Sequence, residues 1–512
     1  MNAKSLGIFG LLVMLFAFMV LMTSDSWTNI FSSTFLQSNN LENLLRRISM
    51  YGLLGIGVAF VIITGGIDLS VGSVVCLAGC LLGIFLQVEY QPASVFDVHR
   101  AKLGSNTVLV HGNADGIYEV GDKLRMYRGR QPALLTVQDV EAVNLADSGG
   151  EPIGVGTVLK VQGLTRDEDS GQVAKAFEIL DFGFGQGNQP AWVSLAGVPF
   201  DLSARDRVAF FHPSLGLKDL VVRSASREGE VSTVEFEQAL GERFSKEWMA
   251  MPTARQQRMA IPLAIMSVLG IAGCLGLLHG LLVTRVHLQP FVVTLCGLLI
   301  YRGISRWLVD DNPVGFGIEY KENLSPLGSG KLSLFEWGTG DAAQTFGIPY
   351  PLFVFLAAAI LAAVFLNLTI WGRYMLALGS NEEAARYSGI RTERVTILAY
   401  VICTISAATG GILFALDSGS ISPSSFGNFY ELYAIAAAVL GGCSLRGGEG
   451  SIFGVIAGTA VMMLLNNLIL LLKIPDRLEF TIIGLVILLG VTLDETVRRI
   501  AARRRAMKSA QS

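Results

Sequence analysis

The segment Gly65-Gly-Ile-Asp-Leu-Ser-Val-Gly-Ser73 places one carboxylate between two apolar runs that leave no room for an ordinary loop. A charged Asp at membrane depth is unfavourable unless it faces a cavity or a partner. Glycine allows close backbone approach, and broken helices persist in a bilayer only where they line protein or water. We therefore predict a helix break in the core or gate of a membrane pathway, formed by Gly65, Gly66, Asp68 and Ser70. A tight interfacial turn in which Asp68 caps the next helix is the alternative, and the two interpretations are compatible.

A related string, Gly441-Gly-Cys-Ser-Leu-Arg-Gly-Gly-Glu-Gly-Ser451, follows a later apolar run. Both strings share the pattern GG-x-x-L…G-S, which indicates an internal repeat of the kind found in transporters. We expect Gly441 and Gly442 to belong to the same core or gate as the first string.

The segment 372–390, which reads GRYMLALGSNEEAARYSGI, has the features of a short capped helix. Asn381 or Ser380 can cap it, and two glutamates follow where the helix dipole favours negative charge. Two alanines then leave a small, flat surface, and a glycine can end the helix. Such a helix suits docking into a cleft on a partner, whereas an ordinary solvated loop helix is the alternative. The predicted docking residues are Asn381, Glu382, Glu383, Ala384, Ala385, Arg386 and Gly389.

Residue patterns for catalysis or cofactor binding are missing from the sequence. The string Pro326-Leu-Gly-Ser-Gly-Lys-Leu-Ser333 lacks the first glycine of the phosphate-binding pattern G-x-x-x-x-G-K-[ST]. Neither HExxH nor GxSxG occurs in an apolar run, so we expect no enzyme activity. The cysteines form no CxxC pattern, and we expect small buried thiols without disulfide, metal or cofactor. They are Cys76, Cys80, Cys274, Cys296, Cys403 and Cys443.

The composition places most of the chain in a membrane. Fifty-one per cent of the 512 residues are hydrophobic and only 16% are charged, whereas soluble domains carry about 25% charged residues. A membrane span needs roughly 20 apolar residues. Apolar runs of about this length occur towards both ends of the chain. The predicted spans are 6–23, 49–65, 70–88, 260–283, 288–306, 350–371, 394–416, 430–443, 452–472 and 478–494. The first is interpreted as an uncleaved span, and 430–443 is short enough to be re-entrant.

The distribution of Lys and Arg predicts the orientation of these ten spans. The basic tail 497–512 and the loop 372–393 would lie in the cytoplasm, and counting back places the N-terminus there as well. The acidic stretch 308–349 would face outward. Arg46 and Arg47 fall on the wrong side of this count and are predicted to belong to an amphipathic segment at the interface.

Residues 89–257 read as a soluble, β-rich domain that faces outward under the same count. Short alternating runs are separated by Gly, Pro, Asn and Asp. Residues 118–124 and 200–208 are weakly alike, which indicates either a duplicated small barrel or chance similarity, and chance is the preferred interpretation. Residues 234–258 are predicted to be helical and to lead back into the membrane.

The segment 372–390 resembles the coupling loop of ABC-importer permeases, in the branch typified by the ribose, xylose and galactose permeases. Other strings resemble the same family in the same order and cover essentially the whole chain outside 89–257. They are Ile62-Ile-Thr-Gly-Gly-Ile-Asp-Leu-Ser-Val-Gly-Ser73, Gly280-Leu-Leu-Val-Thr-Arg-Val-His-Leu-Gln-Pro-Phe-Val-Val-Thr-Leu295, Arg302-Gly-Ile, and Glu431-Leu-Tyr-Ala-Ile-Ala-Ala-Ala-Val-Leu-Gly-Gly442 with 447–454.

This resemblance implies a permease subunit of an ATP-driven importer for a sugar-like solute in a bacterial inner membrane. It implies a separate ATPase subunit that contacts the loop, a periplasmic solute-binding protein, and a second permease copy in a homo- or heterodimer. The family normally has only a short connection where this chain carries 89–257. That insertion is either a recognition or docking module or a passive accessory.

The fold class expected is an all-α polytopic membrane bundle of about ten helices, some broken or re-entrant, with an inserted β-rich extracytoplasmic domain. Its parts would be 1–88, 89–257, 258–496 and the tail 497–512, in contact with membrane lipid and without nucleic acid. An ion-coupled secondary transporter is one rival; it would need charged residues inside spans to bind coupling ions, and the candidates here are Asp68, between two predicted spans, and Glu431. A membrane-anchored sensor or scaffold built on 89–257 is another. Asn466 and Asn467 are predicted to hydrogen-bond a neighbouring helix.

Overall fold

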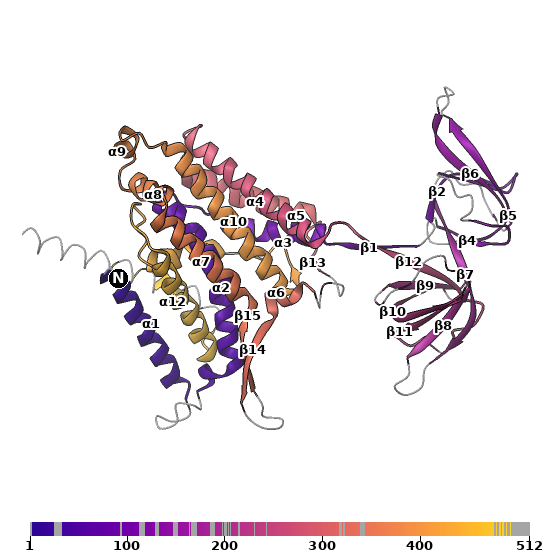
Figure 1. The fold of residues 1–512 in the computed structure, drawn as a ribbon, viewed down its shortest axis with the longest axis horizontal. Helices are drawn as coiled ribbons and strands as arrows, with labels where there is room; N and C mark the ends of the chain where they lie inside the picture. Colours follow the sequence, from indigo (N-terminus) through magenta and orange to yellow (C-terminus); the bar gives the residue numbers. More distant parts are fainter. Residues whose placement is uncertain are drawn as a thin grey trace, which may run out of the picture. The chain divides into compact units, whose positions relative to one another are not determined.

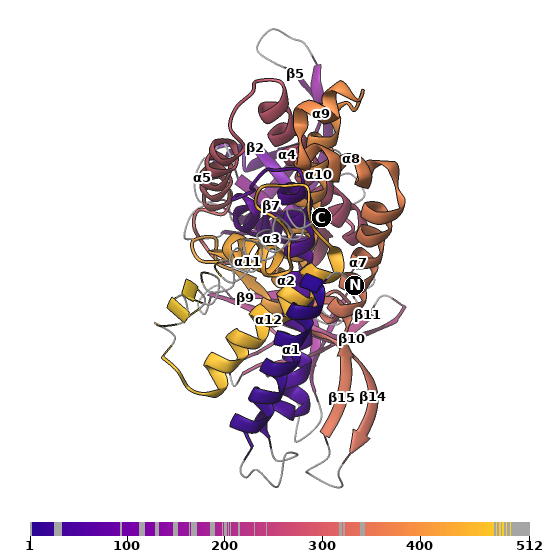
Figure 2. The same cartoon turned by 90° about the vertical axis from the view of Figure 1, so that its left-hand side faces the viewer.

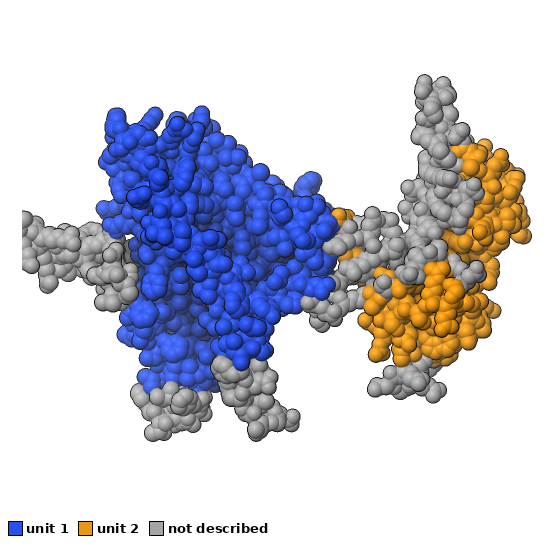
Figure 3. Space-filling model, in the orientation of Figure 1, with its two compact units in different colours: residues 1–87, 259–512 blue, residues 88–258 orange. Residues whose placement is uncertain are grey.

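The chain divides into two compact units, residues 1–87 with 259–512 and residues 88–258 (Figure 3). The computed structural model describes residues 3–475 except 25–32, 93–94, 112–117, 128–132, 147–151, 163, 165–170, 185–189, 197, 199–201, 203, 205, 213–215, 230, 242, 317–319, 321–322 and 338–343. Beyond 475 it describes residues 478, 481–482, 484–485, 488 and 492.

The first unit is a bundle of helices joined by short strands (Figure 1). Its helices are α1 (Ala3–Met22), η2 (Thr34–Leu36), α2 (Ser38–Ile63), α3 (Val71–Phe85), α4 (Ile261–Thr284), α5 (Pro290–Leu308), α6 (Ser325–Ser329), α7 (Tyr350–Leu368), α8 (Ile370–Ser380), α9 (Glu382–Tyr387), α10 (Thr392–Ser418), α11 (Tyr430–Leu440) and α12 (Ile452–Leu471). Its strands are β13 (Val314–Gly315), β14 (Lys331–Trp337), β15 (Gln344–Pro349) and β16 (Ser420–Ile421).

Six of the described helices are long and apolar enough to cross a membrane, namely α2, α4, α5, α7, α10 and α12. Shorter apolar helices occur at 8–22, in α3 and in α11. The membrane bundle with a β-rich insertion is therefore confirmed, whereas the count of about ten spans is not. The last predicted span, 478–494, is described only at isolated positions, and the predicted cytoplasmic tail 497–512 lies outside the described residues.

The centre of the bundle is built around α2 and α10, while α4, α5 and α7 lie at its surface. The most apolar 18 residues of α2 are 78% buried, but those of α4, α5 and α7 are only 22–28% buried. These outer faces therefore remain for lipid or another chain. Cys274 on α4 and Cys296 on α5 are exposed, so the prediction that all cysteines are buried is wrong for these two.

The interfacial segment predicted around Arg46 and Arg47 is instead part of α2, which begins at Ser38. Arg46 lies 3.5 Å from the carboxylate of Asp417 on α10, and Arg47 donates to the amide oxygen of Asn466 at 3.2 Å. Partners on neighbouring helices therefore allow both arginines to lie within a long helix. The predicted role of the amides of α12 in helix packing is confirmed, because Asn467 and Asn40 also exchange hydrogen bonds of 2.8 and 3.3 Å.

The predicted span 350–371 ends earlier than expected. Helix α7 stops at Leu368, and Thr369 caps the separate helix α8 by accepting a hydrogen bond of 3.2 Å from the amide of Gly372. Helices α8 and α9 lie at one end of the bundle, and the hairpin β14–β15 projects from the other (Figures 1 and 2).

A buried carboxylate holds this hairpin to the start of α2. Glu42 is 4% exposed and accepts hydrogen bonds from the Lys331 ammonium at 2.9 and 3.0 Å and from the Gly347 amide at 2.8 Å. Because the hairpin leads directly into α7, this contact fixes where α7 begins.

Replacing Glu42 by alanine removes the acceptor and leaves the Gly347 amide buried without a partner. Hydrogen bonds to charged groups contribute about 1.5–3 kcal/mol, so we expect Glu42→Ala to destabilise the detergent-solubilised protein by about that amount. Thermal unfolding measures the change. Glu393→Ala removes an exposed pair with Arg285 at 3.1 Å and is the control, expected to change stability by less than about 1 kcal/mol. Equal effects of the two substitutions would contradict the assigned role of Glu42.

The second unit consists of strands that close into two small barrels. Its strands are β1 (Val88–Pro92), β2 (Val95–Lys102), β3 (Thr107–His111), β4 (Lys123–Tyr127), β5 (Ala133–Ala146), β6 (Pro152–Gln162), β7 (Gly171–Gly183), β8 (Ala191–Ala196), β9 (Arg207–His212), β10 (Gly216–Glu228), β11 (Val231–Phe236) and β12 (Met249–Gln257). One ring runs β2-β3-β6-β5-β4-β7 and the other β7-β8-β11-β10-β9-β12, and each closes on itself through β7. Separate buried clusters fill the two rings.

The two rings have the same connectivity. Mapping β2–β7 onto β7–β12 in chain order reproduces every strand pairing, and β4 then corresponds to β9. The weakly similar residues 118–124 and 200–208 lead into these two equivalent strands, so duplication of a small barrel explains them better than chance. The helix predicted over 234–258 is also wrong. Strand β11 ends at Phe236, and β12 pairs with β1, β7 and β9.

The two chain ends of this unit lie next to each other. Strands β1 and β12 are antiparallel, with Val88 opposite Gln257, and directly opposite residues lie about 4.5–5.5 Å apart. A two- or three-residue link can therefore replace the whole unit.

We expect a variant that joins Gln87 to Met259 through such a link to reach the membrane in normal amount and to unfold cooperatively. Membrane abundance and thermal unfolding test this expectation. A matched deletion of residues 88–176 keeps β12 but removes β1 and half of β7, and it should misfold. Aggregation of the complete deletion would show that the bundle needs the second unit to fold.

Candidate functional site

The predicted helix break is present between α2 and α3. Helix α2 ends at Ile63, Gly65 adopts a positive φ of 82°, and α3 begins at Val71. The Asp68 carboxylate accepts hydrogen bonds from the backbone amide and the hydroxyl of Ser70, at 2.8 and 2.7 Å. Ser70, rather than Asp68, is the N-cap residue of α3, so the alternative prediction is correct about a tight turn but wrong about the capping residue.

The break is enclosed by side chains from three other helices. The Thr294 hydroxyl of α5 donates to the Ile67 carbonyl at 3.1 Å. His279 and Tyr301 are buried and joined by a hydrogen bond of 2.8 Å, and a Cβ placed on Gly66 would lie 2.8 Å from the Tyr400 hydroxyl. Sequence reasoning missed His279, Tyr301 and Tyr400 because each lies in a different apolar run. Only the packing of α4, α5 and α10 brings them to the break.

Asp68 is fully buried, and one of its carboxylate oxygens, Oδ2, has no hydrogen-bond partner among the described residues. The carboxylate interacts electrostatically with His279, Tyr301 and Tyr400. A buried charge without full compensation is unfavourable, so this position marks the polar centre of the bundle.

The predicted docking segment forms the short helix α9. Asn381 is its N-cap residue and accepts from the Ala384 amide at 2.9 Å, and Glu382 and Glu383 form the first turn. Gly389 follows the helix with a φ of 83°. The capping and termination predicted from the sequence are therefore confirmed as geometry.

The surface of α9 contains one feature that the sequence analysis missed. Tyr387 is 91% exposed, and Ala384 beside it in the helix is also exposed. Ala385 is buried and fixes the helix to the bundle. A large exposed aromatic next to a small residue is typical of an interface anchor, and its position in the predicted loop was the available signal.

A junction of glycines connects α9 to the helix break. Gly379 at the end of α8 has no room for a side chain, because a Cβ there would lie 1.9 Å from the Ile63 carbonyl oxygen and 2.4 Å from the Gly448 nitrogen. The Gly448 amide donates to the same Ile63 carbonyl at 2.9 Å. The ends of α2 and α8 and the loop 441–451 therefore meet at this junction, two residues before the Asn381 cap.

The predicted pair Gly441 and Gly442 lies elsewhere in this loop. Gly441 packs against Gly454 at the α11–α12 connection, where a Cβ would lie 2.6 Å from the Gly454 carbonyl, and Gly442 has a φ of 89°. Within the loop, Gly447 and Gly448 make the contacts with the break. The two glycine strings thus meet, but through different residues from those predicted.

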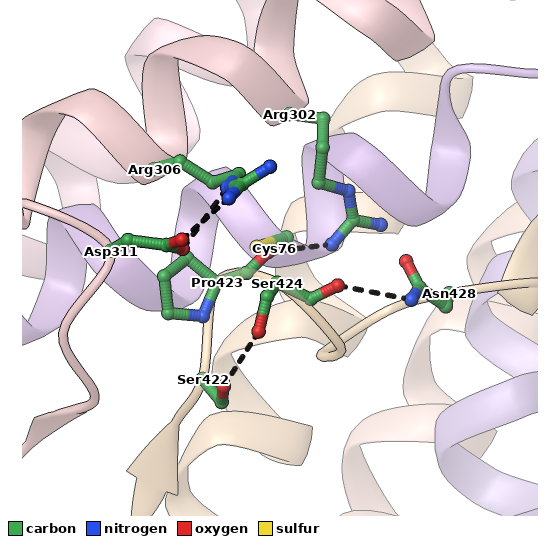
Figure 4. A network of polar contacts seen from close by, with 8 residues as sticks. All are labelled: Cys76, Arg302, Arg306, Asp311, Ser422, Pro423, Ser424 and Asn428. Atoms are coloured by element: carbon green, nitrogen blue, oxygen red, sulfur yellow. Dashed lines mark hydrogen bonds and ion pairs between the residues drawn. The ribbon is translucent and has the colours of Figure 1, made fainter.

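A pocket of about 380 Å³ lies beside α5 and the start of α11. Its lining residues are Leu298, Arg302, Arg306, Ser424, Asn428, Phe429 and Glu431. Arg302 donates to the Pro423 carbonyl at 3.1 Å, and Asn428 donates to the Ser424 carbonyl at 3.1 Å (Figure 4). Arg302 also donates to the Phe426 carbonyl. Arg306 pairs with Asp311 through an Nε contact of 3.0 Å (Figure 4).

The pocket lies where a helix begins inside the bundle. Helix α11 has 11 residues, about 16 Å, and cannot cross a hydrocarbon layer of about 30 Å. A Cβ on Gly72 of α3 would lie 2.2 Å from the Glu431 carboxylate, so the pocket adjoins the first turn after the Asp68 break. The isolated charges of Arg302 and Glu431 within apolar runs were the sequence signal for this site.

A bundle of apolar helices with broken elements around buried charges is the architecture of a polytopic membrane permease. The family described as branched-chain amino acid transport system / permease component matches residues 245–491. The ribose import permease RbsC of Escherichia coli is 34% identical over 232 residues, which are 45% of this chain and 68% of that protein. RbsC of Bacillus subtilis is 35% identical over 217 residues, covering 42% of this chain and 62% of that protein.

The L-arabinose transport system permease AraH of Escherichia coli is 34% identical over 217 residues, covering 42% of this chain and 61% of that protein. No solved structure matches the chain. The chain belongs to the permease family of ABC importers that includes these ribose and arabinose permeases. This is a family of transport proteins and not of enzymes.

The glycine junction generates a prediction about packing. Gly379→Ala must push the Ile63 carbonyl away, and overpacking of this kind costs about 1–3 kcal/mol. We expect a correspondingly lower thermal-unfolding midpoint for the detergent-solubilised variant. Gly270→Ala on α4 meets no atom within 4 Å and is the matched control, expected to be neutral or slightly stabilising. An unchanged midpoint for Gly379→Ala would show that the junction is loosely packed.

Proposed function

We propose that this chain is the permease subunit of an ATP-driven ABC importer that carries a sugar or sugar-like small solute. Relatives named for ribose, arabinose and galactose import support this solute class. Energy is supplied by a separate ATPase subunit that contacts α9. The proposed coupling residues are Asn381, Glu382, Glu383, Ala384, Ala385, Arg386 and Gly389.

The observation that carries the proposal is the connection from α9 to the helix break. An exposed helix with the anchor Tyr387 is separated from the glycine junction by a single capping residue and Ser380. Close-packed backbones transmit displacement because neither side can yield without separating. A movement imposed on α9 by a partner therefore reaches the ends of α2 and α8, and through α2 the proposed core residues Gly65, Gly66, Asp68 and Ser70. Gly441 and Gly442, at the α11–α12 connection, complete the proposed core or gate.

The proposal includes an orientation and further partners. Positive residues in the loop 372–393 support a cytoplasmic location for α9, and both termini are proposed to lie on the same side of a bacterial inner membrane. Residues 88–258 are proposed to be extracytoplasmic. The exposed faces of α4, α5 and α7 are available to lipid and to a second permease copy, and a periplasmic binding protein would deliver the solute.

The buried Asp68 favours one alternative, an ion-coupled secondary transporter. Among the described residues, Oδ2 of Asp68 has no hydrogen-bond partner and its carboxylate interacts electrostatically with His279; such a group binds a proton or cation in transporters of this kind. The two mechanisms differ in their source of energy.

We expect Tyr387→Ala to reduce the amount of ATPase subunit that copurifies with the tagged permease by roughly tenfold, which corresponds to about 1.4 kcal/mol for an aromatic anchor. Quantitative mass spectrometry of complexes isolated from the native membrane measures this loss. The matched control is Phe353→Ala, an aromatic that is 44% exposed near the start of α7 and distant from α9 along the chain. It should leave the ATPase yield unchanged.

Solute uptake separates the two energy sources. ATP depletion should stop uptake in cells, and an ionophore applied while ATP is maintained should not. Uptake that stops with the ionophore, together with normal uptake by Tyr387→Ala, would replace the ABC proposal by the secondary-transport alternative.

A further inference from the structure

The pocket beside α5 has the size of a site for one small molecule. We infer that it binds a neutral polyhydroxyl solute of monosaccharide size; this inference rests on the proposed function and assigns its solute site to particular residues. The volume of about 380 Å³ lies near the lower end of the roughly 300–1,000 Å³ found for small-molecule sites. One sugar ring fits, whereas an oligosaccharide or a peptide does not.

The charges around the pocket cancel in two pairs. Arg306 is paired with Asp311, and its guanidinium holds the pKa of that carboxyl below its usual range, so the aspartate remains charged. Arg302 interacts electrostatically with Glu431, which is 8% exposed. A charged solute would leave one of these groups without its counter-charge in a poorly solvated site. The pocket therefore favours a neutral ligand.

The hydrogen-bonding groups are complementary to hydroxyls. Arg302 uses Nη1 for the two loop carbonyls and also interacts with the Cys76 thiol; because a guanidinium has five N–H groups, further donors remain for a ligand. Glu431 contributes acceptors, and the amide oxygen of Asn428 adds another, since its nitrogen is engaged by Ser424. A hydroxyl both donates and accepts, so neighbouring hydroxyls of one sugar can satisfy this mixed set.

Phe429 provides an apolar surface in a strained conformation. It has a φ of 66°, unusual for a bulky residue, and its side chain is 48% exposed. Strain of this kind persists where the surroundings impose it and gathers at ligand sites. The ring can lie against the C–H face of a sugar, as aromatic linings of small-molecule pockets do.

The position of the pocket connects it to the pathway. Glu431 touches Gly72, in the first turn of α3 after the Asp68 break. The pocket is therefore formed between two discontinuous elements, α2–α3 and the loop into α11. Transporters commonly place their solute sites at such interrupted helices.

The test uses the purified chain in detergent without any ATPase. Ser424→Cys places a thiol at the pocket, and its reaction with a maleimide is measured after subtracting the labelling of the parent protein. The probes are D-galactose, D-galacturonate and D-galactosamine, which share one ring but are neutral, anionic and cationic at pH 7. We expect saturating galactose to slow labelling at least threefold and the two charged sugars to have little effect. Equal protection by all three, or by none, would overturn the inference.

Charge variants provide the second arm. Glu431→Gln leaves Arg302 without its counter-charge, so the preference for galactose over galacturonate should fall at least tenfold. Glu393→Gln, the same change outside the pocket, should keep the preference. Asn428→Ala changes an exposed residue and should weaken galactose protection severalfold even if Glu431→Gln does not fold. The labelling assay contains no ATPase. Its result therefore does not depend on the outcome of the Tyr387→Ala copurification experiment. Normal solute uptake by cells, together with no protection of the Ser424→Cys thiol by galactose, would overturn the assignment of the pocket but not the proposed function.

Discussion

The constraint behind this bundle is that backbone amides and carbonyls within a bilayer must find partners inside the protein. The chain unwinds between α2 and α3 and again before α11, and each unwound stretch exposes carbonyls. Thr294 donates to Ile67 in the first stretch, and Arg302 donates to Pro423 and Phe426 in the second. Both donors belong to α5, so one helix satisfies both interruptions and its position is determined by them.

This arrangement explains why charged side chains occur inside helices that are otherwise apolar. Arg302 can remain in α5 because it serves the carbonyls of an interrupted segment, and Glu431 can remain at the start of α11 because it faces Arg302. The backbone approach that holds these parts together needs glycine at specific points. Gly72 admits the Glu431 carboxylate, and Gly379 admits the Ile63 carbonyl. The buried charges and the close backbone packing thus have the same structural origin.

Local signals predicted local structure well. The Asn381 cap, the glutamates of α9 and the break after Ile63 depend on neighbouring residues, and the structure has them as expected. The surroundings of Asp68 could not be predicted, since His279, Tyr301 and Tyr400 come from separate helices whose packing leaves no trace in local periodicity. The helix predicted over 234–258 failed because β12 is determined by pairing with distant strands. The weak similarity before β4 and β9 became meaningful only once the common connectivity of the two barrels was known.

The same reasoning explains how a large unit can occupy one connection of a membrane bundle. Because β1 and β12 pair at the entry point, residues 88 and 257 lie directly opposite each other. The connection between α3 and α4 therefore constrains these helices as a short loop would, regardless of the size of the inserted unit. The entropic cost of closing a flexible loop rises with its length, but here the pairing of β1 with β12 inside the inserted unit already holds the two ends together. Insertion at this site consequently leaves α3 and α4 free to pack as they would with a short link.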